Sequence, residues 1–309
     1  MEARRALGWL PDIPKPTDYT EEHPAVAPLL AQTGLRMRVA AQSVFGAIET
    51  GAGGLSAPAN PSRQDLRAYF SPIEDQGQLG SCTANAAVAL LEYFEKRASG
   101  KFIDASRLFV YKTERDLLGS TGDTGAYLRT AMEALVLFGA PPERFWPYDG
   151  RPAAANPRYE LEPTSFCYAF ASNYQAIKYF RLDPPGVTPA QVLQNIKQYL
   201  AAGFPSIFGF PVYSEYDAAQ RDPSDGHSKV PFPAAGSQYR GGHANVAAGY
   251  DDNMTVGGKK GALLVRNSWG TAWGEGGYAW MSYDYVTQGL ALDWWTMTSA
   301  NWVQTGAFN

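Results

Sequence analysis

The sequence predicts an α+β protein, because its helical segments come first along the chain and its strands come later. Apolar residues at helical spacing predict helices over 81–98, 124–138 and 188–202. From residue 204 onward, short apolar runs are separated by glycine-rich turns, which is typical of strands. Helices and strands do not alternate regularly, so a doubly wound parallel sheet is not expected.

Each predicted helix has its own start or stop signal. The first begins at Ser81, a residue type that caps helix N-termini, and ends before Gly100. The second ends at Gly139, which two prolines follow. The third begins with a capping box, because Thr188 is followed three residues later by Gln191. These signals place the helix ends independently of the apolar spacing.

The strand region consists of short apolar segments with few polar interruptions. The predicted strands are SIFGFPV, ANVAAGY, GALLVRNSW and GYAWMSY. No internal repeat accompanies them, so a solenoid or propeller is not expected.

Composition excludes several classes of function. With 45% hydrophobic residues the chain has ample material for a packed core, and its net charge of −4 offers no basic field for nucleic acid or anionic membrane. No stretch approaches the length of a membrane span, and no apolar leader begins the chain, so a cytoplasmic protein is expected. Two cysteines, Cys82 and Cys167, cannot form a disulfide framework. They and the three histidines lack metal-ligand spacing, so neither a metal nor an organic cofactor is expected.

The first 63 residues differ in composition from the rest of the chain. They hold three of the 41 aromatic residues, but seven prolines and six glycines. A short helix is expected over 35–49 and a linker of small and polar residues over 50–62. The chain is therefore divided into an N-terminal arm, 1–63, and a folded domain, 64–309.

Three later segments carry residues suited to nucleophilic catalysis. Cys82 opens the first predicted helix, His243 opens a predicted strand, and Asn267 stands in the sequence NSWG. A thiol attacks carbonyl carbon as the thiolate, and the positive end of a helix dipole lowers the pKa of a thiol placed there. A histidine can take that proton and return it to a leaving group, while a third polar residue orients its ring.

These motifs, in the order Cys, His, Asn, resemble the papain family of cysteine peptidases over about residues 70–309. The resemblance implies two lobes with a cleft between them. Cys82 would lie in a helical lobe, about 70–165, and the histidine and asparagine in a β-barrel-like lobe, about 166–309. It also implies a thiol peptidase that hydrolyses peptide bonds of peptide or protein substrates through a cysteine acyl-enzyme.

The resemblance assigns roles to further residues. Gln76, six residues before the cysteine, would stabilise the oxyanion together with the backbone N–H of Cys82. Asn267 would orient the histidine ring, and Trp269 would lie over the histidine–asparagine pair. Trp273 would lie farther along the primed side of the cleft, which holds the residues after the cut.

Three positions are implied to contact substrate. Gly125 resembles a glycine whose strand pairs with the substrate backbone, where only a small residue allows close approach. Gly242 stands where the family usually has an aspartate. The absence of that side chain opens the pocket for the second substrate residue before the cut. Asp293, by alignment of QGLALDWW with a late strand of the family, would lie at the floor of that pocket and favour a basic side chain.

The chain departs from the family pattern at two positions near the nucleophile. Leu79 replaces a cysteine that is usually bridged, which fits a reducing compartment, and Thr83 replaces the usual tryptophan. The arm does not resemble the family's long helical pro-segment. Two hypotheses for the arm stay open: it contacts and partly covers the cleft as a built-in regulator, as in a zymogen, or it packs elsewhere as a tether.

Two other functions compete with peptide hydrolysis. A peptide ligase or amidase-type acyl transferase would use the same Cys–His pair and would be recognised by transfer to an added amine. A peptide-binding module kept occluded by its arm would show no activated thiol. Both alternatives remain to be separated by experiment.

Overall fold

The computed structural model describes residues 6–33, 35, 60–152, 157–172, 177–217, 219 and 221–308. The helix expected over 35–49 and the linker expected over 50–62 lie outside the described residues, except for residues 35 and 60–62.

Helices and strands fall largely in separate parts of the described chain. The helices are α1 (Ala27–Leu30), α3 (Cys82–Ser99), α4 (Arg107–Leu117), α5 (Leu128–Leu137), α6 (Ser165–Ala171), α7 (Pro189–Ala201), α8 (Asp284–Thr287) and α9 (Ala300–Val303). The strands are β1 (Arg63–Asp65), β2 (Lys178–Arg181), β3 (Ser206–Tyr213), β4 (Lys229–Val230), β5 (Tyr239–Val256), β6 (Lys259–Arg266), β7 (Tyr278–Ser282) and β8 (Leu292–Thr298).

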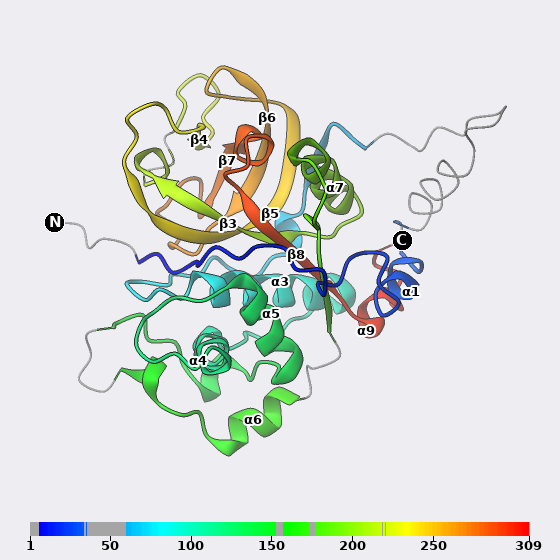
Figure 1. Cartoon of the computed structure of the whole chain (residues 1–309), viewed down its shortest axis with the longest axis vertical. Helices are drawn as coiled ribbons and strands as arrows, with labels where there is room; N and C mark the ends of the chain where they lie inside the picture. The colour runs from blue at the N-terminus through cyan, green and yellow to red at the C-terminus, as the bar shows by residue number, and fades with distance from the viewer. Residues whose placement is uncertain are drawn as a thin grey trace.

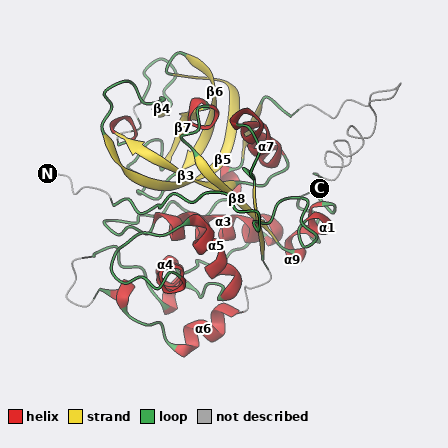
Figure 2. Ribbon diagram, viewed as in Figure 1, coloured by secondary structure: helices red, strands yellow, loops and turns green. Residues whose placement is uncertain are grey.

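The molecule has two lobes, one helical and one built on the sheet. In Figure 1, α4, α5 and α6 lie together on one side and the strands curve around the other, with α3 between them. Figure 2 shows the same separation by colour, with yellow strands above and most red helices below. The α+β class and the two-lobed architecture expected from the sequence are confirmed.

The sheet is open rather than closed into a barrel. Its order is β2-β8-β3-β5-β6-β7-β4, with β1 added to β5. The long strand β5 pairs antiparallel with β3 on one side and with β6 on the other. Among the described strands the two ends of this order, β2 and β4, do not pair with each other. The strand that carries His243 is therefore central, where neighbours hold it on both sides.

Local signals predicted some helices and missed others. The predicted capping box is present at Thr188, and α7 begins at the next residue. The helix expected over 124–138 begins later, at Leu128, because the backbone of Ala126 bonds to another segment, donating to Gly8 O and accepting from Leu10 N–H. Helix α4 was not predicted, since its charged side chains, among them Arg107 and Glu114, are buried and blur the apolar face.

The described part of the arm lies on the body and joins its core. Figure 1 shows this blue segment running between the two lobes before it turns to α1. Trp9, Val26, Leu30 and Leu35 are buried in the same hydrophobic cluster as the body's side chains. None of the helices in the described ranges is long and apolar enough to cross a membrane.

Candidate active site

Helix α3 begins at the nucleophile candidate. Cys82 is its first residue, is fully buried and forms no disulfide. The backbone N–H groups of Gly8 and Ala244 face its sulfur, the first from the arm and the second from β5. Because Ala244 directly follows His243, the start of the helix and the histidine's strand meet at this point.

The other two triad candidates lie on strand β5 and directly after the end of β6. His243 Nε2 lies 2.8 Å from Asn267 Oδ1, and both side chains are buried. This contact needs a proton on Nε2, so the neutral ring has Nδ1 as its basic nitrogen. Nδ1 has no hydrogen-bond partner in the described part of the chain. The Trp269 ring lies 4.8 Å from the histidine ring, centroid to centroid, and shields the pair from water.

Burial keeps the thiol and the imidazole neutral in this conformation. Loss of hydration raises the pKa of Cys82 to about 12, against the lowering by the facing N–H groups. The same cause lowers the pKa of His243 to about 4, although the contact with Asn267 favours the charged ring. The thiolate expected from the helix dipole is therefore not favoured while the cleft is covered.

A buried carboxyl group, that of Glu114, contacts the residue that follows Cys82. Thr83, at the position where the family usually has tryptophan, donates a hydrogen bond of 2.8 Å to Glu114 Oε1. Burial raises the pKa of Glu114 well above its usual range, which favours the neutral carboxyl. In its charged form Glu114 would raise the pKa of Cys82 further. A neutral acid here removes an obstacle to thiolate formation.

The side chain of Gln76 is fixed in one orientation. Its Oε1 accepts a 2.6 Å hydrogen bond from the Ser268 hydroxyl, so its NH₂ group points the other way. Nε2 donates to the carbonyl oxygens of Leu79, at 3.0 Å, and of Ala6 in the arm, at 3.2 Å. The amide is thus presented to a carbonyl in the cleft, which is the geometry that an oxyanion donor needs.

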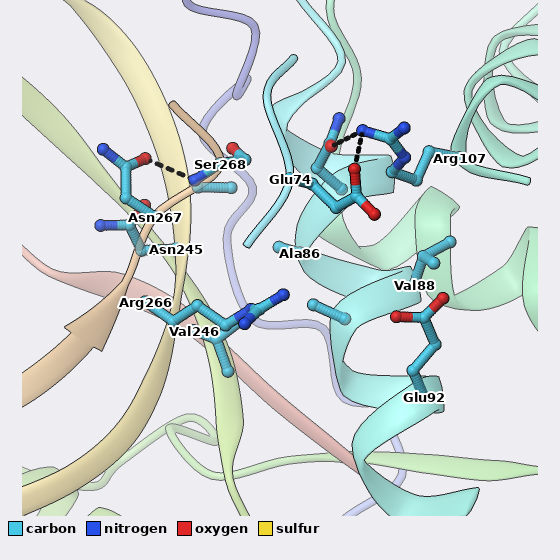
Figure 3. Close-up of a pocket in the computed structure, with 13 residues that line it drawn as sticks. Glu74, Ala86, Val88, Glu92, Arg107, Asn245, Val246, Arg266, Asn267 and Ser268 are labelled. Atoms are coloured by element: carbon cyan, nitrogen blue, oxygen red, sulfur yellow. Dashed lines mark hydrogen bonds and ion pairs between the residues drawn. The ribbon is translucent and has the colours of Figure 1, made fainter. Parts of the chain in front are cut away.

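Ser268 was not singled out from the sequence, although it stands in the NSWG motif. Its carbonyl also accepts the backbone N–H of Gln76 at 2.8 Å, and its own N–H donates to Asn267 Oδ1 at 2.8 Å. Figure 3 shows the latter contact beside a small cavity between α3 and the strands. One serine therefore connects the glutamine and the asparagine.

The arm crosses the cleft as an extended segment. Trp9 N–H donates to the carbonyl of Gly242 at 3.1 Å, and Ala126 makes two bonds, accepting from Leu10 N–H and donating to Gly8 O. A Cβ on Gly242 would lie 2.2 Å from an arm carbonyl, and one on Gly125 would lie 2.1 Å from another. Both glycines predicted to contact substrate, Gly125 and Gly242, therefore lie against the arm. The backbone hydrogen bonds to the arm are made by Ala126, the residue after Gly125.

The Trp9 side chain fills a pocket closed by Asp293. Its indole Nε1 donates to Asp293 Oδ2 at 3.1 Å, and Asp293 is fully buried. Arg181 Nη2 pairs with the other oxygen of this carboxylate at 3.3 Å. Gly209 in β3 makes room for the indole, since a Cβ there would lie 1.9 Å from the ring. An isolated glycine in the apolar run SIFGFPV was the signal for a close approach that sequence analysis left unused.

Trp273 lies beside Trp269, with the centres of the two rings 6.3 Å apart. Its indole N–H donates to the carbonyl of Tyr216 at 3.0 Å, and the rings of these two residues are 4.9 Å apart. The Tyr216 ring also contacts Trp269 at 5.2 Å. The three aromatic rings form one continuous wall next to His243.

Residues 60–292 match the family model described as papain family cysteine protease. The chain belongs to the papain family. This papain-family chain is 35% identical over 225 residues to an uncharacterized peptidase C1-like protein of Acanthamoeba polyphaga mimivirus, with 72% of this chain and 68% of the viral protein covered. It is a cysteine peptidase and hence a hydrolase.

Solved and curated relatives extend the comparison. The crystal structure of xylellain, a cysteine protease from Xylella fastidiosa, has a TM-score of 0.71 and 29% identity, covering 97% of this chain and 99% of xylellain. Papain of Carica papaya is 26% identical over 208 residues, covering 67% of this chain and 50% of papain. Cathepsin K of Gallus gallus is 28% identical over 228 residues, covering 71% and 58%. The chain thus spans half to three fifths of the length of the last two.

The neutral state of Cys82 and His243 predicts how the rate of Cys82 alkylation depends on pH while the arm covers the thiol. We expect the rate at which iodoacetamide alkylates Cys82 in the full chain to rise about tenfold per pH unit from pH 6 to pH 10 without levelling off, since the thiol pKa lies above this range. Intact-mass spectrometry with peptide mapping measures the rate at Cys82. A plateau that starts below pH 6 would instead indicate a thiolate–imidazolium pair under the arm.

Proposed function

We propose that this papain-family peptidase hydrolyses peptide bonds through a Cys82 acyl-enzyme. The observation that carries the proposal is the convergence of three segments: the start of α3, the strand of His243 and the turn of Asn267. The thiol faces the residue after the histidine, and the histidine's far nitrogen contacts the asparagine. This arrangement supplies a nucleophile, a base and an orienting group.

Each residue would have a defined part in the reaction. With a peptide in place of the arm, Cys82 loses its proton to His243 and its sulfur attacks the peptide carbonyl carbon. The imidazolium returns the proton to the departing amine as the carbon–nitrogen bond breaks. Water then hydrolyses the thioester, with the histidine acting as base. Asn267 keeps the ring in the orientation that both steps need.

Gln76 would stabilise the negative charge that develops on the carbonyl oxygen. The hydrogen bond from Ser268 leaves its NH₂ group aimed into the cleft, where it already binds a carbonyl oxygen of the arm. The backbone N–H of Cys82 at the start of α3 is the second donor. Removal of such a donor lowers turnover by about 10²–10³-fold.

We also propose that the arm is an autoinhibitory segment. It covers the thiol, fills the pocket above Asp293 with an indole and binds the oxyanion donor through Ala6. Two buried arginines of the body hold it by ion pairs. Arg129 pairs with Asp12 at 2.5 Å and with Asp18, and Arg181 pairs with Asp18 at 3.5 Å. The described ion-pair partners of Arg129 both come from the arm.

The pocket above Asp293 suggests a substrate preference. Its carboxylate is paired with Arg181 and accepts the indole N–H of Trp295 at 2.7 Å, and the group it binds from the arm is also a neutral N–H donor. We propose that the pocket selects a large aromatic residue with a donor, rather than the basic residue that the sequence suggested. The floor is then a hydrogen-bond acceptor more than a counter-ion.

The catalytic assignment predicts that activity depends on only one of the two cysteines. Cys82→Ala is expected to abolish hydrolysis of fluorogenic peptides and modification by an epoxysuccinyl peptide, because the nucleophile is lost. Cys167→Ala is the matched control, since the hydrogen bonds of this buried thiol within the described residues are to the Phe145 carbonyl and from the Thr164 hydroxyl, neither of which is a candidate site residue. Equal modification of both cysteines, or none at Cys82 in the opened chain described next, would favour a binding module.

Weakening the arm is expected to open the cleft. Trp9→Ala removes the buried indole and its bond to Asp293, so we expect hydrolysis and Cys82 modification to increase about tenfold or more. Arg129→Met tests the same idea without emptying the indole pocket and is expected to act in the same direction. Ile13→Ala is the control in the same segment, because this side chain is 78% exposed. Unchanged kinetics in both opened variants would contradict autoinhibition.

The pocket assignment predicts the order in which peptides are cleaved. In the full chain carrying Trp9→Ala, we expect tryptophan as the second residue before the cut to exceed phenylalanine by about tenfold in kcat/KM, since only the indole donates to Asp293. Matched fluorogenic peptides that differ at this residue alone measure the ratio. A preference for arginine at this position would show that Arg181 leaves the Asp293 charge unbalanced.

A further inference from the structure

The residue before the nucleophile sends its hydroxyl away from the helix that it precedes. Ser81 stands at the N-cap of α3, but its side chain caps no backbone N–H. Its Oγ lies 2.5 Å from the hydroxyl oxygen of Tyr148, which also lies 3.0 Å from the carbonyl oxygen of Gln76. One phenol hydroxyl therefore bridges the residue that carries the side-chain oxyanion donor and the residue next to the backbone donor of Cys82.

The chemistry of the partners fixes the direction of each hydrogen bond. A carbonyl only accepts, so Tyr148 donates to Gln76 and must accept from the Ser81 hydroxyl. Ser81 Oγ in turn accepts from Asn85 Nδ2 at 3.0 Å, and Asn85 Oδ1 accepts from Arg107 Nη1 at 3.3 Å. Hydrogen bonds aligned in this way polarise one another. This series of hydrogen bonds runs from the Arg107 guanidinium to the backbone carbonyl of Gln76.

Other contacts hold this chain of hydrogen bonds rigidly. The Arg107 guanidinium lies 4.1 Å from the centre of the Tyr148 ring, and it pairs with Glu74 at 2.9 Å and with Glu143 at 3.3 Å. Figure 3 shows Arg107 meeting Glu74 at the edge of the small cavity. Glu143 also accepts the backbone N–H of Tyr148 at 2.7 Å. The tyrosine is therefore fixed at its backbone, its ring and its hydroxyl.

The segment after Tyr148 binds the same loop through the backbone. Gln78 N–H donates to the carbonyl of Gly150 at 3.0 Å, and a Cβ on Gly150 would lie 2.7 Å from the Gln76 carbonyl oxygen. The loop from Gln76 to Cys82 thus rests on 148–150 along its length. The Tyr148 hydroxyl contacts Gln76 at one end of this loop and Ser81, next to Cys82, at the other.

We propose that Tyr148 is a positioning residue for the oxyanion site. Its hydroxyl sets the separation of the two donors, the Gln76 side chain and the Cys82 backbone N–H, by tying together the ends of their loop. The proposal rests on the proposed acyl-enzyme function, since only that reaction develops an oxyanion. A donor displaced by about 1 Å can cost a hundredfold in rate, so the loss of one hydroxyl is measurable in turnover.

The test compares Tyr148→Phe with its parent, in the full chain opened by Trp9→Ala. We expect kcat for an amide substrate to fall about tenfold with KM unchanged, because the donors act mainly on the transition state. Alkylation of Cys82 by iodoacetamide, which forms no oxyanion, is expected to keep its rate. Tyr168→Phe is the matched control, since its hydroxyl donates to the exposed Glu162 at 2.7 Å.

A double variant separates positioning from a general structural effect. Gln76→Ala alone is expected to lower kcat about 10²-fold, and adding Tyr148→Phe to it should lower kcat by less than about threefold more, because once the Gln76 amide is gone the hydroxyl has no second donor to place relative to the Cys82 N–H. A full tenfold further loss, or an unchanged kcat in Tyr148→Phe alone, overturns the proposal. If the opened parent shows no Cys82-dependent hydrolysis, the proposed function fails and the inference with it.

Discussion

The close contact between the start of α3 and strand β5 is the constraint on which the site depends. It brings Cys82 next to Ala244 although 162 positions separate them in the sequence, and it needs small side chains on both elements. The first turns of α3 read CTANAA and the facing part of β5 reads ANVAA, and the alanines of both are buried. Strand β5 is central in the sheet: β3 pairs with it at His243, and β6 pairs with it from Val246 onward. Larger residues would separate the thiol from the imidazole's strand.

Water access decides which charge state the same residues adopt. With the arm in place, both the thiol and the imidazole lose their hydration, and the neutral pair is favoured over the ion pair. The glycines that admit the arm are also what gives the cleft its width, since a Cβ at Gly209 or Gly242 would enter the space that the arm uses. The arm therefore fits the space that these glycines leave open. A peptide that takes the arm's place must supply backbone contacts of the same kind.

Local sequence predicted some helices and the candidate nucleophile position, whereas long-range contacts could not be predicted from it. Cys82 at a helix start and Thr188 in a capping box follow from neighbouring residues, and the structure has both helices at these positions. Ser81 shows the limit, because its hydroxyl bonds to Tyr148 rather than capping α3, a choice that only the tertiary structure decides. Trp9 shows it more strongly. A lone aromatic among prolines has no periodicity, and its partner Asp293 is 284 residues away.

The continuity of the arm with the core has a kinetic consequence. Its described residues run from the cleft to Val26 and Leu30, which are buried, so the covering segment is tethered within the molecule. An intramolecular competitor acts at an effective concentration of about millimolar for short flexible tethers, and this value does not change when the protein is diluted. Occupancy of the cleft is thus a property of each molecule alone. Under the autoinhibition proposed above, a free peptide must match that local concentration, or bind correspondingly tighter, before it displaces the arm.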